Sequence, residues 1–247
     1  MQPLTNSLGN SLRKVARPLL RDFYELEMLQ NSSRGTTDFC NRSFQKVKTS
    51  LRDEFARNHD HIIFADSTDS SSEIPIDASA VLLIQPIEAI NNLSKSLPFF
   101  CLMVTYLKKI DGKLTAMNSI MLFPALHELL YAEKGGGSWF EKTSMDSSGK
   151  AIRLRIPNNS IPEKPFIGTD SFKHSSPNIR ITGSFCYDLN LLMIGKLDAI
   201  YASSLNSVLK PGFELFVKEA GGFICDLNSG VIASNQKLTE KIKHQYT

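Results

Sequence analysis

Histidines and carboxylates between residues 59 and 66 are the first groups whose types suggest metal chemistry. His59 and His61 flank Asp60, and Asp66 follows a few residues later. Imidazole and carboxylate groups are common metal ligands, and a step of two residues turns both histidines to one side of a strand. No third ligand follows at a usual spacing, so we interpret His59 and His61 as a solvent-facing pair at a helix–strand junction.

Three other groups have residue types that can take part in catalysis or phosphate binding. Ser184 and Cys186 are nucleophile types, but the sequence assigns them no histidine or aspartate partner. His127 precedes Glu128 and has the chemistry of a general base, but it lies in a turn-and-strand segment. Residues 135–137 are consecutive glycines without the Lys-Ser/Thr of a phosphate-binding loop, so we predict a tight turn there.

Hydrophobic patterns predict that a mixture of helices and strands positions these groups. Apolar stripes or blocks predict helices near residues 12–29, 44–55, 189–194 and 210–220. Pro18 lies inside the first stripe, so that helix either begins near Arg17 or is kinked there. Apolar runs predict strands near residues 61–65, 80–84, 99–108, 114–123, 128–131, 138–140, 152–156, 165–169, 179–182, 197–202, 223–225 and 231–233.

The order and connection of these elements predict an α+β fold. The run at 80–84 is continuously apolar, as in a strand covered on both faces. Asp111 and Gly112 separate two strand-like runs and predict a hairpin. Helices and strands do not alternate regularly, which favours α+β layers over a repeated βαβ array.

A polar, glycine-containing stretch at residues 144–150 is the best candidate for an internal boundary. It divides the chain into residues 1–145, an N-terminal half of helices and antiparallel sheet, and residues 146–247, a C-terminal α/β half. We expect the two halves to form one compact unit, with the candidate site between them.

Composition excludes several classes of protein. The chain has 247 residues, of which 42% are hydrophobic and 21% charged, so it is globular rather than disordered or collagen-like. A net charge of +3 is too small to indicate direct nucleic-acid binding, and no apolar stretch is long enough for a membrane span. The N-terminus has no signal-peptide pattern, and the cysteines share no metal-ligand spacing, so we expect reduced thiols in a cytoplasmic protein. The cysteines are Cys40, Cys101, Cys186 and Cys225.

Four segments, in order, resemble the motifs of one enzyme family. Residues 34–39 fit Lys-Gly-x-x-Asp-Phe, and residues 83–92 resemble Asp-Pro-Ile-Asp-Gly-Thr-x-Asn after a buried strand. Residues 123–137 resemble a stretch that begins Asn-Pro and continues Glu-Leu-Tyr-x-Ala and Gly-x-Gly-Ala. Residues 183–222 carry Asp-Leu, Gly-Lys-Leu-Asp and Glu-Ala-Gly-Gly in the family's order. Together they cover nearly the whole chain, which resembles the inositol monophosphatase family.

This resemblance implies a fold and a chemistry. The fold is the layered α-β-α-β-α sandwich of the Mg²⁺-dependent, lithium-sensitive sugar phosphatases, and members are commonly homodimers. The family hydrolyses phosphomonoesters with a cluster of carboxylates that hold two or three Mg²⁺ ions. Mg²⁺ prefers oxygen ligands in octahedral geometry, and paired metals polarise the phosphoryl group and activate a water.

Compared position by position, this sequence departs from the family at its signature. Gln85 and Glu88 stand at the two signature aspartates, while the backbone carbonyl of Ile87 can still face the site. Ala89 and Ile90 replace the family's Gly-Thr. If the family glycine has a positive φ, alanine costs about 1 kcal/mol there and disturbs a turn that would cradle phosphate.

The other family positions depart as well. Either Ala65 or Asp66 takes the place of the first glutamate ligand, and one sequence does not decide between them. Leu209 stands at the aspartate of a Trp-Asp motif in a gapless alignment; if a helical turn is instead deleted after Pro211, that carboxylate is lost too. Ala202 stands where the family has a substrate-contacting glutamate.

These replacements predict a family member that is catalytically silent and acts by binding a protein or a ligand, with no cofactor. Some bacterial relatives act in transcription through protein contacts, which makes such a role conceivable here. The alternative is a Mg²⁺-dependent phosphomonoesterase for inositol monophosphate or similar sugar phosphates, using Asp66 and Glu88. A third reading is a folded remnant without a function. Phe44, Leu209 and Ile90 can also fill the old cleft, since Phe44 stands at an early carboxylate position.

Overall fold

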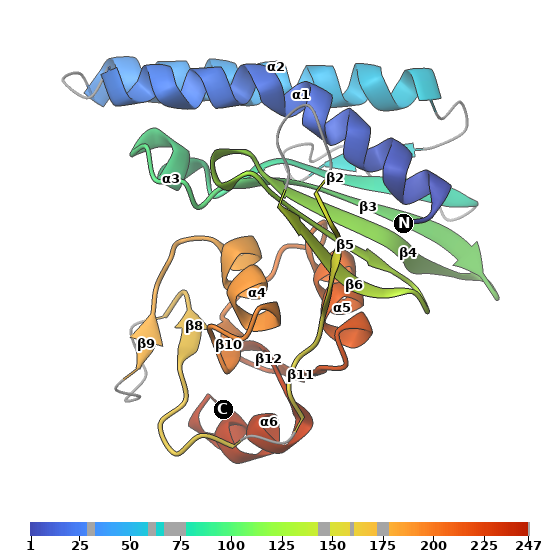
Figure 1. Cartoon of the computed structure of the whole chain (residues 1–247), viewed down its shortest axis with the longest axis vertical. Coiled ribbons are helices and arrows are strands. Elements are labelled where there is room, and N and C mark those ends of the chain that lie inside the picture. Colours follow the sequence, from blue (N-terminus) through green and yellow to red (C-terminus); the bar gives the residue numbers. More distant parts are fainter. Residues whose placement is uncertain are drawn as a thin grey trace.

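Two long amphipathic helices lie side by side over one face of a large sheet (Figure 1). The computed structural model of the chain describes residues 1–28, 33–58, 63–66, 78–142, 149–158, 161–171 and 178–246. The two helices are α1, Pro3–Met28, and α2, Ser33–Asn58. Their buried residues recur at helical spacing, so the apolar stripe of each helix faces the sheet.

Pro18 lies inside α1, which continues on both sides of it. The helix changes direction near its middle in Figure 1, as expected where proline removes a backbone donor and crowds the preceding turn. The kinked alternative is therefore correct, and the helix does not begin near Arg17. The second helix already begins at Ser33, well before the predicted stripe at 44–55.

The larger sheet has the strand order β1-β2-β3-β4-β5-β6-β7 among the described residues. Only β1 and β2 run parallel; each later neighbour is antiparallel. The strands are β1 Ile63–Asp66, β2 Ala80–Glu88, β3 Cys101–Ile110, β4 Lys113–Phe123, β5 Glu128–Glu133, β6 Gly137–Lys142 and β7 Ile152–Leu154.

The central strands are buried on both faces. In β2, Leu82 and Ile84 belong to the core beneath α1 and α2, whereas Val81 and Leu83 belong to a cluster on the opposite face. Because successive strand side chains point to opposite faces, both faces of β2 must be apolar. This confirms the prediction made from the continuous run at 80–84.

A tight turn joins β3 and β4 at Asp111 and Gly112, which confirms the predicted hairpin. Both residues have positive φ angles, 49° and 77°, as a type I′ turn requires. Glycine accepts this conformation without strain, and aspartate is one of the few other residues that tolerate it.

A smaller sheet with the order β11-β12-β10-β8-β9 lies on the far side of α4 and α5 (Figure 1). The helix α6 packs on its outer face, around Ile167, Tyr201 and Leu238. These strands are β8 Ile167–Thr169, β9 Ile179–Arg180, β10 Ala199–Ala202, β11 Phe223–Leu227 and β12 Gly230–Ser234. The remaining helices are α3 Ile90–Ser94, η1 Pro124–Leu126, α4 Phe185–Met193, α5 Lys210–Glu219, α6 Gln236–Ile242 and η2 Lys243–Gln245.

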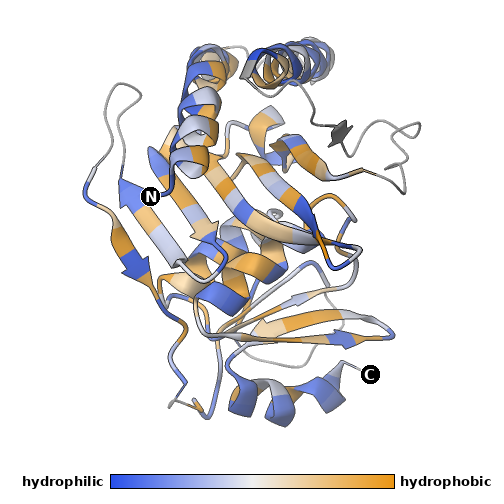
Figure 2. Cartoon of the chain, turned by 90° about the vertical axis from the view of Figure 1, so that its right-hand side faces the viewer, coloured by the Kyte–Doolittle hydropathy of each residue, from blue (hydrophilic) through white to orange (hydrophobic). Residues whose placement is uncertain are grey.

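The layers therefore alternate as helices, sheet, helices, sheet and helix, which is the predicted α-β-α-β-α sandwich. Figure 2 shows hydrophobic residues concentrated on the strands and on the helix sides turned towards them. The strand β7 lies beyond residue 145 and still pairs with β6, so the larger sheet takes one strand from the 146–247 half. None of the helices in the described ranges is both long and apolar enough to cross a bilayer.

Close packing of α5 against the larger sheet depends on Gly212. A methyl group at this position would collide with the side chains of Met103, Thr105 and Ser119. The last two are themselves joined by a buried hydrogen bond of 2.8 Å. The absence of a side chain thus lets the helix approach the sheet closely.

We expect Gly212→Ala to lower the free energy of unfolding by about 1–3 kcal/mol, because the added methyl overpacks the interface. Gly9→Ala in α1 is the matched control: its methyl would meet neighbours no closer than 3.7 Å. That variant should be up to about 1 kcal/mol more stable, since alanine favours helix over glycine. Chemical denaturation of both variants checks this; equal effects would contradict the close approach at Gly212.

Candidate functional site

The candidate site lies where β2 ends and turns towards α4. Gln85 pairs with Met103 and Glu88 pairs with Cys101, so β2 has one residue more than β3 between these pairs. This is a β-bulge, and Pro86 lies within it, where no backbone donor is needed. The bulge re-aims the side chains at the end of the strand and sets Glu88 directly across from Cys101.

The Gln85 side chain is buried and hydrogen-bonded to the backbone of its own strand. Its Nε2 donates to the carbonyl of Ile87 at 3.1 Å. Its Oε1 accepts a longer contact, 3.5 Å, from Nδ2 of Asn206, whose Oδ1 caps the backbone N–H groups of Val208 and Leu209. The Ile87 carbonyl therefore faces an amide donor.

The carboxylate of Glu88 caps the first turn of α4. Its Oε2 accepts from the Ser184 hydroxyl at 2.5 Å, and its Oε1 accepts from the backbone N–H of Phe185 at 3.0 Å. Ser184 is also the N-cap residue, accepting from the N–H of Tyr187 at 3.0 Å. Burial raises the pKa of Glu88 to about 7, although the hydrogen bonds from Ser184 and Phe185 act in the opposite direction.

A second buried carboxyl, Asp188, lies in the same helix. It accepts from the Thr182 hydroxyl at 2.7 Å, and burial raises its pKa to about 7. The charge of Asp170 raises this pKa further, while the Thr182 hydrogen bond lowers it. Sequence reasoning did not single out Asp188 as a titratable group, because its burial follows only from the packing of α4 between the sheets.

Apolar side chains packed in the core occupy most of the other positions at which the family has metal- or substrate-binding residues. Leu209 is 6% exposed in the core between the larger sheet and α4 and α5, and Ala202 is fully buried in β10. Phe44 and Ile90 pack instead against the core on the α1 and α2 side of the sheet. These apolar side chains therefore fill opposite sides of the sheet rather than forming one plug.

Ala89 has φ 60° and ψ 50°, a left-handed conformation, at the start of α3. This is the conformation expected of the family glycine if that glycine has a positive φ, and here an alanine adopts it. Only a short helix follows, whose N–H groups bond back to the Ala89 carbonyl. The strain of alanine in this conformation is about 1 kcal/mol.

The end of β1 lies beside β2 through its backbone. Ala65 pairs with Leu83 and Asp66 pairs with Ile84, so the strand partner of Asp66 directly precedes Gln85. The predicted strand at 61–65 is thus confirmed from Ile63 onwards. The residues His59, Asp60 and His61 lie outside the described residues.

The other groups singled out by type have structural roles. The Glu128 carboxylate accepts from Asn190 at 2.8 Å, which ties β5 to α4. His127, the residue before Glu128, ends the turn η1 in a left-handed conformation with φ 54°. The glycines at 135–137 form the predicted turn, whose N–H groups at 135 and 137 donate to Glu219 at 2.7 and 2.9 Å.

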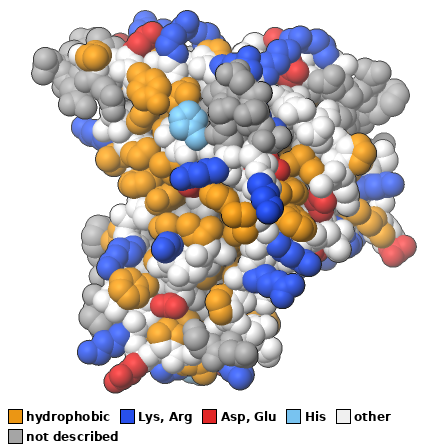
Figure 3. All heavy atoms as spheres, in the orientation of Figure 1, with side chains coloured by type: hydrophobic (Ala, Val, Ile, Leu, Met, Phe, Trp, Pro, Cys, Tyr) orange, Lys and Arg blue, Asp and Glu red, His pale blue; other side chains and the backbone are white. Residues whose placement is uncertain are grey.

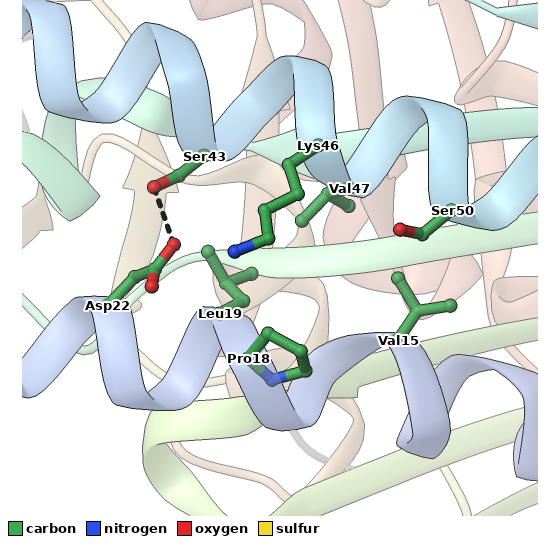
Figure 4. Close-up of a pocket in the computed structure, with 8 residues that line it drawn as sticks. All are labelled: Val15, Pro18, Leu19, Asp22, Ser43, Lys46, Val47 and Ser50. Atoms are coloured by element: carbon green, nitrogen blue, oxygen red, sulfur yellow. Dashed lines mark hydrogen bonds between the residues drawn. The ribbon is translucent and has the colours of Figure 1, made fainter.

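A small cavity of about 20 Å³ lies between α1 and α2 (Figure 4). Its polar groups are Asp22, Ser43, Lys46 and Ser50, and the Ser43 hydroxyl donates to Asp22 at 2.7 Å. A cavity of this volume holds about one water, so it is too small for a sugar phosphate.

Two cysteines that share no ligand spacing in the sequence meet beside Glu88. Ligand atoms of Glu88, Cys101 and Cys186 lie within 4.8 Å of one another, and all three residues are buried. Burial raises the pKa of the Cys101 thiol, and the hydrogen bond with Cys101 raises that of Cys186. Sequence spacing did not reveal this cluster, because a cross-strand pair and a helix start bring it together.

Several known proteins are similar to this chain along most of its length. No protein-family model matches the chain. The inositol-1-monophosphatase of Mesorhizobium japonicum is 23% identical over 238 residues, which cover 92% of this chain and 86% of that protein. The Nus factor SuhB of Escherichia coli strain K12 is 23% identical over 243 residues, covering 93% of this chain and 87% of the relative.

Solved structures share the arrangement of layers. The extragenic suppressor protein SuhB of Bartonella henselae has a TM-score of 0.79 at 20% identity and covers 100% of this chain and 99% of its own. Inositol monophosphatase II of Staphylococcus aureus MSSA476 has a TM-score of 0.71 at 15% identity, covering 92% of this chain and 89% of its own. Sequence relatives along nearly the full length and a shared fold together support a relationship of this chain to the inositol monophosphatase and SuhB proteins.

Proposed function

We propose that this chain is a catalytically silent member of the family that acts by binding a protein or ligand and does not hold Mg²⁺. The observation that carries the proposal is the engagement of Gln85 and Glu88, the residues at the two signature aspartates, with protein groups. Each of these two side chains is hydrogen-bonded to groups of the fold.

The Gln85 amide supports this proposal because it is uncharged and because its N–H group points at a carbonyl. It has no negative charge to neutralise Mg²⁺, and its N–H group points at the Ile87 carbonyl, which the family resemblance assigns to the metal. A hydrogen-bond donor and a hard cation compete for the same carbonyl oxygen. Breaking the existing bond would leave a buried amide unpaired, at a cost of about 1–3 kcal/mol.

The contacts of Glu88 and Leu209 also support the proposal. The carboxylate of Glu88 is turned onto the N-terminus of α4, and Leu209 is packed in an apolar core. Mg²⁺ binds through several oxygen ligands and retains water in octahedral geometry. Among the described side chains, Glu88 supplies the single carboxylate at these three positions, which supports the loss of the two-metal site.

A binding role agrees with the names of several relatives. Inositol-1-monophosphatases and Nus factors are both among the proteins similar to this chain, at the same identity. Figure 3 shows lysine and arginine side chains spread between apolar ones on the displayed face. We propose a homodimer with a protein partner in the cytoplasm, without direct nucleic-acid contact.

We expect no phosphate release above a no-protein blank from inositol and sugar monophosphates at millimolar Mg²⁺. An active family member, assayed in parallel, is the positive control. Lithium-sensitive release that depends on Mg²⁺ would overturn the proposal and support the alternative phosphomonoesterase. In that case Asp66→Asn and Glu88→Gln should each abolish turnover, because these would be the remaining ligands.

Restoring the carboxylates should restore Mg²⁺ binding. We expect the triple variant Gln85→Asp, Glu88→Asp and Leu209→Asp to gain about 1.4 kcal/mol of stability at a Mg²⁺ concentration ten times its Kd. The wild type should show no Mg²⁺-dependent shift in thermal unfolding. The neutral counterpart, Gln85→Asn, Glu88→Asn and Leu209→Asn, controls for packing damage. An equal shift in the wild type would contradict the proposed loss of the site.

Without a cation beside it, Glu88 should make stability fall as pH rises. Its folded-state pKa of about 7 exceeds the ordinary 4.5, so the folded state binds a proton more tightly than the unfolded state. That stabilisation is complete below about pH 4.5 and is lost as pH rises to about 7, by on the order of 1 kcal/mol or more. Asp188, with its pKa raised to about 7, acts in the same direction.

Denaturation in metal-free buffer between pH 4.5 and 8 measures this slope. Glu88→Gln should flatten it in part, whereas Asp111→Asn in the exposed hairpin turn should leave it unchanged. A free energy of unfolding that rises with pH across this range would contradict the assignment.

A further inference from the structure

We propose that Glu88, Cys101 and Cys186 form a buried site for a thiophilic divalent cation such as Zn²⁺. This site differs from the family's Mg²⁺ cluster in its donors, since two of the three ligand atoms are sulfur. It goes beyond the proposed function, because a silent member has no need of it for phosphate chemistry.

The geometry of the three ligands favours a cation. Their ligand atoms lie within 4.8 Å of one another, on residues that are 6%, 0% and 3% exposed. Bonds of about 2.3 Å to sulfur and about 2.1 Å to oxygen place tetrahedral zinc ligands about 3.5–3.8 Å apart. The ligand atoms would therefore approach one another by about 1.3 Å at most. Side-chain rotation can supply this while Glu88 stays paired with Cys101.

The surrounding hydrogen bonds orient the carboxylate as an outer shell does at metal sites. The Glu88 carboxylate accepts from the Ser184 hydroxyl and from the backbone of Phe185 and Cys186, which leaves one of its four lone pairs for a cation. Metal-binding carboxylates are commonly held in this way, and the held orientation favours binding.

Sulfur donors determine which cation fits. The thioether of Met103 lies 3.9 Å from the Cys186 sulfur and adds a soft donor beside the cluster. Cys186 is the second residue of α4 and so follows directly on Phe185, whose backbone N–H donates to Glu88. Thiolates select Zn²⁺ and similar cations over Mg²⁺, which prefers oxygen.

Binding of Zn²⁺ at this site releases protons from the thiol ligands. Zn²⁺ forms bonds to both sulfurs and to one carboxylate oxygen, and the two thiol protons leave to solvent. Because the cluster is closed to solvent, the cation would enter as the chain folds or opens locally. We therefore expect slow exchange once the site is loaded.

The test uses the full chain with Cys225→Ser, which removes the one partly exposed cysteine. Purified without oxygen and refolded with Zn²⁺, it should retain one zinc per chain after desalting. With Co²⁺ it should develop sulfur-to-cobalt charge-transfer bands and the visible bands of a tetrahedral ion. Millimolar Mg²⁺ should not displace either ion.

Variants separate the cluster from the other thiols. Cys101→Ser and Cys186→Ala should each lower Zn²⁺ affinity at least ten-fold and abolish or weaken the charge-transfer bands. Glu88→Gln should lower the affinity while leaving those bands in place. Cys40→Ser, at a buried cysteine outside the cluster, should behave as the parent, and circular dichroism checks that every variant is folded.

Three results would overturn the proposal. The first is that the parent chain, folded and with its thiols reduced, retains no zinc. The second is that Cys101 and Cys186 form a disulfide and no metal binds. The third is binding that survives in a folded double variant lacking both Cys101 and Cys186. None of these results affects the phosphatase assay, so this proposal and the proposed function fail separately.

Discussion

The contact between the Glu88 carboxylate and the first turn of α4 connects the two halves of the molecule. It joins the end of a strand in the larger sheet to a helix that lies between the sheets. A buried carboxylate is costly unless hydrogen-bonded, and the free N–H groups at a helix start supply the required donors. The neighbouring β-bulge and Pro86 matter because they aim Glu88 at that helix. The same direction places it beside the two cysteines.

The fold of this chain and the residues at its candidate site are separate questions. The layers, the strand order and the packing of α5 on Gly212 belong to the scaffold and depend on the pattern and packing of apolar residues. The positions that the resemblance assigns to catalysis contain an amide, a capping carboxylate and a leucine. A fold hosts a reaction only through the groups at its site, so the same architecture is compatible with a binding role.

Much of the architecture follows from local patterns in the sequence. The two-faced strand at 80–84, the hairpin at Asp111 and the helix that opens with Pro211 need only periodicity and turn chemistry. Pro18 left two possibilities, and the burial of α1 against the sheet favours the kinked helix because breaking it would expose its stripe. The meeting of Cys101 with Cys186 depends on register and helix placement, which no single segment encodes.

The attachment of α5 has a consequence for how such a scaffold changes over time. Glu219 at its end accepts from the turn at 135–137, and the Ser138 hydroxyl donates to the carbonyl of Phe216. These hydrogen bonds, like those of Glu88, join one element of the fold to another. Substitutions at catalytic positions can therefore accumulate one at a time while the shape persists, and such a chain can drift from an enzyme towards a new role.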